Sequence, residues 1–169
     1  MNKDELLKLL ETKGIYYKKY EHEPLFSVQD SETKRGEIEG SHTKNLFLKN
    51  KKDSFYLFSC EENSIVDLKK LSKAIIAGNL SFAREEYLIK HLQVRAGSVS
   101  PYALLNDKEN KIEFFFEDSL YNKDKINFHP LINTSTITLE TSEFINFMIE
   151  NKKKVNIFSL KDYRIAEIL

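Results

Sequence analysis

The spacing of hydrophobic residues changes along the chain and predicts a mixture of helices and strands. Leucines recur at helical spacing between Asn2, which can cap a helix, and Gly14, which can end it. In "NLFLKN" (45–50), a short apolar run places Leu46 and Leu48 opposite Phe47, as expected for a strand. The predicted strands are residues 15–22, 45–50, 55–60, 111–118 and 135–140, and the other predicted helices begin at Ser27 (to about Arg35), Asp67, Ser81 and Thr141.

These elements predict one α+β domain, residues 1–169, with a mixed and mostly antiparallel sheet flanked by helices. The strands 45–50 and 55–60 are separated by the polar "KKDS", which suits a hairpin. The C-terminal extension, 151–169, begins with a three-lysine run that we expect to be a solvated helix exit. Its apolar residues are expected to pack, with a partner contact as the alternative: Val155, Ile157, Phe158 and Leu160.

The composition excludes several classes of function. Lys+Arg and Asp+Glu are both 26, so nucleic acid can be held only by a local basic patch. The one cysteine, Cys60, rules out an internal disulfide, and its apolar neighbours indicate a buried thiol. The four histidines do not have the spacing of a zinc site. Because no apolar run is long enough for a signal peptide or a membrane span, we expect a cytoplasmic protein without membrane partner, metal or cofactor.

Three polar segments are candidates for chemistry. Lys44 precedes the apolar part of the strand 45–50, where it either meets water or holds an anion at the rim of a pocket. The loop "GSVSP" (97–101) is either a plain turn or a set of backbone amides that grip a carbonyl oxygen. In "FHPLINTST", the residues His129, Asn133 and Thr136 either stabilise a turn or orient a water or an amino group.

In this order the segments "HTKNLFLKNKK", "LSFAREEYL", "GSVSPYALLND" and "FHPLINTSTITLE" resemble one known family. It is the YbaK and prolyl-tRNA-synthetase-associated editing domain family, and the chain is most similar to its free-standing alanyl-editing branch (PrdX or ProXp-ala). The resemblance covers about residues 3–150. It implies a trans-editing deacylase that hydrolyses the ester of mischarged tRNA, most readily alanine on proline tRNA, in a pocket too small for proline.

The resemblance also implies roles for the candidate residues. The catalytic residues expected are Lys44 and Asn133. Lys44 binds the terminal adenosine phosphate or the ester carbonyl, and Asn133 and His129 line the amino-acid pocket and help to place the water. The loop holds the carbonyl and amino end of the substrate through backbone groups. The substrate-binding residues expected are Gly97, Ser98, Val99, Ser100, Pro101, His129 and Thr136, and the expected tRNA contacts are Lys49, Lys51 and Lys52.

Two alternatives to removal of alanine remain open at this point. One is the same reaction on another small amino acid, such as cysteine on proline tRNA. The other is a tRNA-binding or regulatory module without catalysis. In each case the acceptor end of a tRNA is the expected partner, and prolyl-tRNA synthetase is a second candidate.

Overall fold

A computed structural model describes residues 1–25 and 37–169 of the chain, so the helix predicted between Ser27 and Arg35 lies outside the described residues. The strands are β1 (Lys18–Glu21), β2 (Ser41–Lys49), β3 (Phe55–Glu61), β4 (Ser81–Phe82), β5 (Ile112–Glu117), β6 (Lys125–Phe128), β7 (Ser135–Glu140), β8 (Asn156–Ser159) and β9 (Arg164–Ile168). The helices are α1 (Lys3–Thr12), α3 (Leu68–Ala74), α4 (Glu85–Tyr87), α5 (Asp118–Tyr121) and α6 (Thr141–Glu150), with a π-helical turn η1 (Leu88–Leu92) and a 3-10 helix η2 (Pro101–Asn106).

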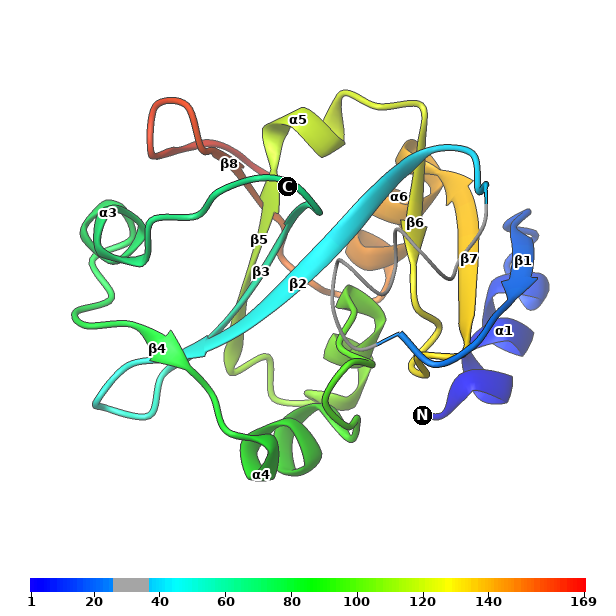
Figure 1. The fold of residues 1–169 in the computed structure, drawn as a ribbon, viewed down its shortest axis with the longest axis horizontal. Helices are drawn as coiled ribbons and strands as arrows, with labels where there is room; N and C mark the ends of the chain where they lie inside the picture. The colour runs from blue at the N-terminus through cyan, green and yellow to red at the C-terminus, as the bar shows by residue number, and fades with distance from the viewer. Residues whose placement is uncertain (26–36) are drawn as a thin grey trace.

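The described strands form one mixed sheet in the order β1-β7-β6-β2-β3-β5-β8-β9, with β4 paired to β2 off this path. β2 runs diagonally across the middle of the molecule, with β6 and β7 to one side and β3, β5 and β8 to the other (Figure 1). The pairs β6–β2, β3–β5 and β5–β8 are parallel, and the other pairs are antiparallel. The predicted α+β class with a mixed, mostly antiparallel sheet is therefore confirmed.

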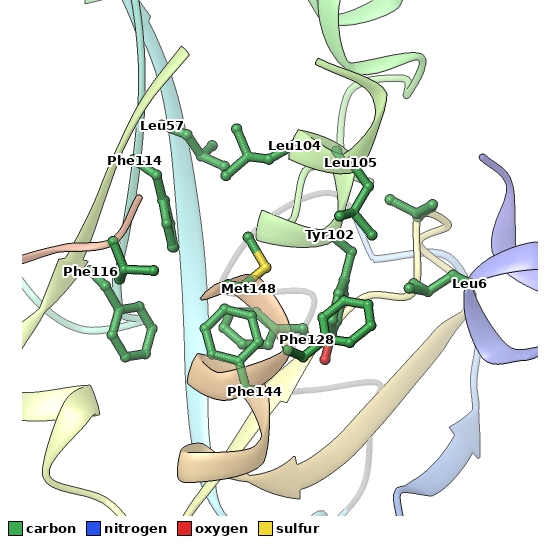
Figure 2. Packing of buried hydrophobic residues seen from close by; sticks show 14 of the residues in the cluster. Leu6, Leu57, Tyr102, Leu104, Leu105, Phe114, Phe116, Phe128, Phe144 and Met148 are labelled. Carbon is green, nitrogen blue, oxygen red and sulfur yellow. The ribbon is translucent and has the colours of Figure 1, made fainter. Parts of the chain in front are cut away.

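Two hydrophobic clusters cover the opposite faces of the central strands. In the larger cluster, side chains of α1, α6 and η2 pack against β3, β5 and β6 (Figure 2). Its centre is Tyr102, whose ring centroid lies 5.8 Å from that of Phe128 and 5.7 Å from that of Phe144. Because alternate residues of a strand face opposite sides, β2 contributes Phe47 to this cluster and Leu48 to the other, which α3 covers.

The local signals near two helix starts and in the hairpin are confirmed. The Asn2 side chain accepts the Glu5 N–H at 3.0 Å, and the Glu5 carboxylate accepts the Asn2 N–H at 2.9 Å, which is a capping box. The Asp67 side chain accepts two backbone N–H groups at the start of α3. β2 and β3 pair antiparallel around the predicted turn.

The predicted start of a helix at Ser81 is wrong, although helical residues do follow in α4 and η1. Ser81 and Phe82 form β4, which pairs with Lys49 and Leu48 of β2, and α4 begins only at Glu85. The physical reason is that β2 leaves an unpaired edge at this end, and a short extended segment satisfies its backbone groups better than a helix would.

Several predicted boundaries also need correction. β1 is shorter than predicted, because the Ile15 N–H donates to the Leu10 carbonyl at 3.0 Å and so belongs to the end of α1. β2 begins at Ser41, so Lys44 lies within the strand and does not mark its start. Residues 125–128 form a strand that was not predicted, β6. Thr141 is the first residue of α6, and Glu140 holds the cap position.

The C-terminal residues add two strands to the sheet. Val155, Ile157 and Phe158 are buried, which confirms that they pack, and β8 pairs with β5. The lysine run is not simply solvated, because Lys153 Nζ donates to the Asp107 carbonyl at 2.6 Å. Burial lowers the pKa of Lys153 accordingly. Of the helices in residues 1–25 and 37–169, none is long and apolar enough to span a membrane.

Candidate active site where β2 and β6 separate

The edge of β2 that faces away from β3 is paired with another strand only near its two ends. β6 pairs with it only through Ser41 and His42, and Thr43 Oγ1 extends the contact by donating to the Asn127 carbonyl at 2.7 Å. β4 pairs with it at Leu48 and Lys49. Among the described strands, none pairs with this edge in the interval between the two contacts. The loop 97–101 faces this interval, since Asn45 Nδ2 donates to the Val99 carbonyl at 3.0 Å.

The loop is fixed at both ends. Gly97 has a φ of +82°, a left-handed conformation that favours glycine. After it, Pro101 begins η2 and the next residue, Tyr102, is fully buried among aromatic rings. Proline and the buried tyrosine therefore hold the loop against the core, close to the open edge of β2.

The loop contains polar groups without partners among the described residues, and one of them is a buried hydroxyl. The Ser98 N–H donates to the Arg95 carbonyl at 3.1 Å, so this amide is used within the turn. In the described ranges, the backbone N–H groups of Val99 and Ser100 have no backbone acceptor. Ser100 is fully buried, and its Oγ likewise has no partner within those ranges. Because an unpaired buried hydroxyl is costly and the two amides have no backbone acceptor in these ranges, the three groups suit an oxygen supplied by a ligand.

Asn45 was not singled out by the sequence, although it holds β2 and the loop together. Its Oδ1 accepts a hydrogen bond from Ser59 Oγ at 2.6 Å while its Nδ2 donates to Val99. The sequence did carry one signal for Asn45: it is a polar residue on the same face of the strand as Phe47, which is in the core. Replacement of both bonds by water would leave the loop without this anchor.

We expect Asn45→Ala to loosen the loop selectively. Loss of the bond to Val99 removes about 1 kcal/mol and leaves Ser59 Oγ without its acceptor. Backbone amide hydrogen exchange of residues 97–100 is then expected to become about fivefold faster. Asn151→Ala, which removes a bond to the Phe147 carbonyl at the end of α6, is the matched control and leaves the loop unchanged. Equal exchange in the wild type and the Asn45 variant would show that the loop does not depend on Asn45.

His129 directly follows β6 and is half-buried. Its Nδ1 lies 2.9 Å from the Ser135 carbonyl, and since a carbonyl only accepts, Nδ1 carries the proton and Nε2 has the lone pair. Burial lowers the pKa of His129, the bond to Ser135 opposes this shift, and the nearby His22 adds to it. The imidazole is therefore a neutral hydrogen-bond acceptor through Nε2.

The other residues predicted in this segment lie beside His129. Thr136 is buried, and its Oγ1 is 2.8 Å from Nε2 of His22, a residue that the sequence did not single out. The two histidine rings lie 5.8 Å apart. Asn133 Nδ2 donates to the Leu25 carbonyl at 3.2 Å, so Asn133 fixes the chain that follows β1. The structure thus gathers His129, Thr136 and Asn133 with His22 at the end of β1, β6 and β7.

The lowered pKa of His129 predicts how stability depends on pH. The unfolded chain binds a proton on this histidine below its ordinary pKa of about 6.5, whereas the native state does not. The free energy of unfolding is therefore expected to fall as the pH drops through this range and below it. His91, whose pKa is also lowered by burial, contributes in the same direction. Urea unfolding of wild type and His129→Asn between pH 5 and 7.5 should show a shallower fall in the variant; parallel curves would contradict a neutral native His129.

Lys44 contributes its side chain to the other face of β2. It pairs with Cys60 of β3, and its Nζ donates to the Ser64 carbonyl. Cys60 is fully buried, as expected, and burial raises the pKa of its thiol to about 12. An ammonium has three N–H donors, so the bond to Ser64 leaves donors for an anion. The backbone of Lys44 lies at the open edge of β2. Its ammonium lies on the face of the sheet opposite to the one where Asn45 contacts the loop.

The three lysines proposed to contact tRNA lie at the far end of β2. Lys49 is five residues from Lys44, a distance of about 16 Å along a strand. Its Nζ is 2.7 Å from Asp53 and 5.2 Å from the ring centroid of Tyr87. Lys51 and Lys52 are exposed in the turn between β2 and β3. The structure does not bring these lysines beside Lys44, so any contact they make is with a more distant part of a bound tRNA.

The histidine pair is the nearest approach to a metal-ligand set at this site. His22 Nδ1 lies 2.8 Å from the Glu23 carbonyl and its Nε2 2.8 Å from Thr136 Oγ1, so both nitrogens of that ring have partners, as does His129 Nδ1 through Ser135. Across the described residues, no group of three His, Cys, Asp or Glu side chains is placed to hold a metal ion.

Comparison with known proteins identifies the family. The aminoacyl-tRNA editing domain matches residues 22–147. The chain is 33% identical over 138 residues to the prolyl-tRNA editing protein ProX of Acetoanaerobium sticklandii, covering 81% of this chain and 84% of that protein. It is 31% identical over 141 residues to the prolyl-tRNA synthetase associated domain-containing protein 1 of Danio rerio, covering 82% and 77% of the two chains.

A similar fold occurs among solved structures. One that is provisionally described as a trans-editing enzyme for prolyl-tRNA synthetase superposes with a TM-score of 0.65 at 16% identity, over 93% of this chain and 96% of that one. The segments gathered around β2, the loop 97–101 and His129 all lie within the matched residues 22–147. The chain therefore belongs to the aminoacyl-tRNA editing domain family.

Proposed function

We propose that this protein removes alanine from mischarged proline tRNA by hydrolysing the ester at the tRNA 3′ end. Editing of aminoacyl-tRNA is the activity of the family, and the identity of the amino acid and of the tRNA is our proposal. The observation that carries it is the open edge of β2: the loop 97–101 contacts this strand through Asn45, and β6, the strand that precedes His129, pairs with it only at Ser41 and His42. The substrate is the acceptor end of a cytoplasmic tRNA.

The chemistry needs a held carbonyl and a positioned water more than it needs a strong nucleophile, because an aminoacyl ester is already activated. The N–H groups of Val99 and Ser100 donate to the ester carbonyl oxygen and to the negative charge that develops on it. The neutral Nε2 of His129 accepts a hydrogen bond from the α-amino group or from the attacking water. Asn133 and Thr136 fix the segment that carries His129.

The reaction transfers one water molecule to the ester. The water oxygen bonds to the carbonyl carbon, the bond from that carbon to the ribose oxygen breaks, and the ribose oxygen takes the proton. The products are free amino acid and a tRNA with its terminal hydroxyl restored. The neighbouring ribose hydroxyl can relay the proton to the leaving ribose oxygen. Lys44 binds the terminal adenosine phosphate with the donors that Ser64 leaves.

The size difference between alanine and proline is the reason to favour alanine. Proline tRNA is mischarged with smaller amino acids because a synthetase gains only about 1–3 kcal/mol per methylene in rejecting them. An editing site works as a second sieve when it admits these residues and excludes proline by size. Cysteine is close to alanine in volume and is the competing substrate.

A deacylation panel tests the proposal. Purified protein is mixed with proline tRNA carrying alanine, cysteine, serine or proline, and the rate of loss of each ester is measured. We expect the alanyl ester to be hydrolysed fastest and the prolyl ester to survive. Faster loss of the cysteinyl ester would replace alanine by cysteine, and loss of the prolyl ester would contradict the size sieve. Binding of the tRNA without hydrolysis of any ester would favour the non-catalytic alternative.

A further inference from the structure

Lys44 lies in a row of three residues that crosses β2, β3 and β5. Lys44 of β2 is paired with Cys60 of β3. The last parallel pair between β3 and β5 is Ser59 with Phe116, so the next residue of each strand places Glu117 beside Cys60. Neighbours in register point to the same face of a sheet. A cationic and a buried anionic side chain therefore flank a small thiol, and both charges act on the pKa of that thiol.

One residue connects the two charges. Ser64 Oγ donates to the Glu117 carboxylate, at 2.9 Å and 3.0 Å from its two oxygens, while the Ser64 carbonyl accepts from Lys44 Nζ. Glu117 Oε2 also accepts the Glu61 N–H at 2.7 Å. Both ends of the turn 61–64 are thus held by a carboxylate that is only 5% exposed. A buried carboxylate is costly unless it is bonded and compensated, so its presence here requires a reason.

We propose that Glu117 is a positioning residue for Lys44. It holds the turn 61–64 in place, and the turn presents the Ser64 carbonyl that fixes the lysine ammonium on the face of β2 opposite Asn45. The negative charge of Glu117 also compensates the half-buried ammonium through the same residue. The importance of this arrangement for hydrolysis rests on the proposed function, in which Lys44 binds the substrate. The arrangement itself does not.

A purely structural role for Glu117 is the competing explanation, since the carboxylate also stabilises the turn. The two roles differ in their dependence on Lys44. If Glu117 acts through Lys44, its removal has no further effect once Lys44 is absent, because residues that act as a unit are not additive. If it acts only on stability, its removal costs activity equally in both backgrounds.

The experiment combines four proteins with a readout that does not require activity. The proteins are the wild type, Glu117→Gln, Lys44→Ala and the double variant, and kcat/KM for alanyl-tRNA hydrolysis is measured for each. In the wild type and Glu117→Gln, the rate at which acetic anhydride acylates Lys44 is followed by peptide mass spectrometry. Ser64→Ala, which removes only the hydroxyl link, is a milder second variant should Glu117→Gln fail to fold. Asp107→Asn is the matched control, because Asp107 Oδ2 accepts the Ile112 N–H at 2.8 Å in a different turn.

We expect Glu117→Gln to lower kcat/KM about tenfold in the wild-type background and not at all in the Lys44→Ala background. Acylation of Lys44 should become several times faster, since the ammonium is released from Ser64, and Ser64→Ala should shift both readouts less but in the same direction. Asp107→Asn should leave both unchanged. Unchanged acylation of Lys44 in a folded Glu117→Gln protein, or an equal loss of activity in both backgrounds, would overturn the proposal. Full activity of Lys44→Ala would instead contradict the proposed function, while the acylation rate still decides whether Glu117 holds Lys44.

Discussion

Lys44→Ala is expected to lower kcat/KM for hydrolysis of alanyl-tRNA about 100-fold. The substitution removes the ammonium that we propose binds the terminal phosphate, and on that proposal the 3′ end loses the contact that fixes it relative to the Val99 and Ser100 amides. A charge-assisted hydrogen bond in a half-buried position is worth more than an exposed ion pair, which explains the large effect. Steady-state rates over a range of tRNA concentrations measure it.

Lys51→Ala is the matched control for this prediction. Lys51 is exposed in the turn at the far end of β2, so its loss removes the same charge without touching the site. We expect less than a threefold change in kcat/KM, and a smaller one at higher salt concentration. If Lys44→Ala and Lys51→Ala had the same effect, Lys44 would be one of many weak contacts with the tRNA backbone and not a residue of the site.

Phe144→Ala is expected to lower the free energy of unfolding by about 3–5 kcal/mol, the largest effect on stability that we predict. Phe144 is fully buried, and its ring centroid lies 4.8 Å from that of Phe128, 5.5 Å from that of Phe116 and 5.7 Å from that of Tyr102. Removal of the ring leaves a cavity between α6, β6 and η2 (Figure 2). Because Tyr102 anchors the loop 97–101 and Phe128 precedes His129, activity should fall as well.

Phe82→Ala serves as the control, since Phe82 is 62% exposed in β4. Urea unfolding of the three proteins compares the two substitutions of the same residue type. We expect Phe82→Ala to change the free energy of unfolding by about 0.5 kcal/mol or less. A cost for Phe144→Ala below about 1.5 kcal/mol would mean that the aromatic cluster collapses around the cavity and is not the rigid support described here.

The fold was predictable where a local signal decides the structure. Asn2 and Asp67 cap their helices, and the alternating residues of β2 and β3 form a hairpin, because these interactions join residues close in sequence. The errors occur where distant residues decide. Ser81 has the chemistry of a helix cap, but the unpaired edge of β2 recruits it into β4. β6 is short, and its pairing with β2 and β7 makes it a strand.

The sequence and its family resemblance indicated the three segments of the candidate site. They did not indicate which side chains and backbone groups of these segments make the contacts. The period of two in a strand already implied that Lys44 and Asn45 face opposite sides, and the structure shows that Asn45 is the residue that contacts the loop. The sequence could not indicate that the Ser98 amide is used within the turn, whereas the Val99 and Ser100 amides have no backbone acceptor in the described ranges. Nor could it pair His22 with His129, which lie more than one hundred residues apart but 5.8 Å from ring to ring.

The most direct measurement of the central claim is where the acylated 3′ end binds. An adenosine carrying alanine through a non-hydrolysable 3′-amide link is titrated into isotopically labelled protein, and backbone amide shifts are followed by NMR. The largest shifts are expected at Asn45, Val99, Ser100 and His129, around the gap between β2 and β6. Shifts centred instead on the lysines of residues 108–111 and 152–154, with none at the loop 97–101, would contradict it.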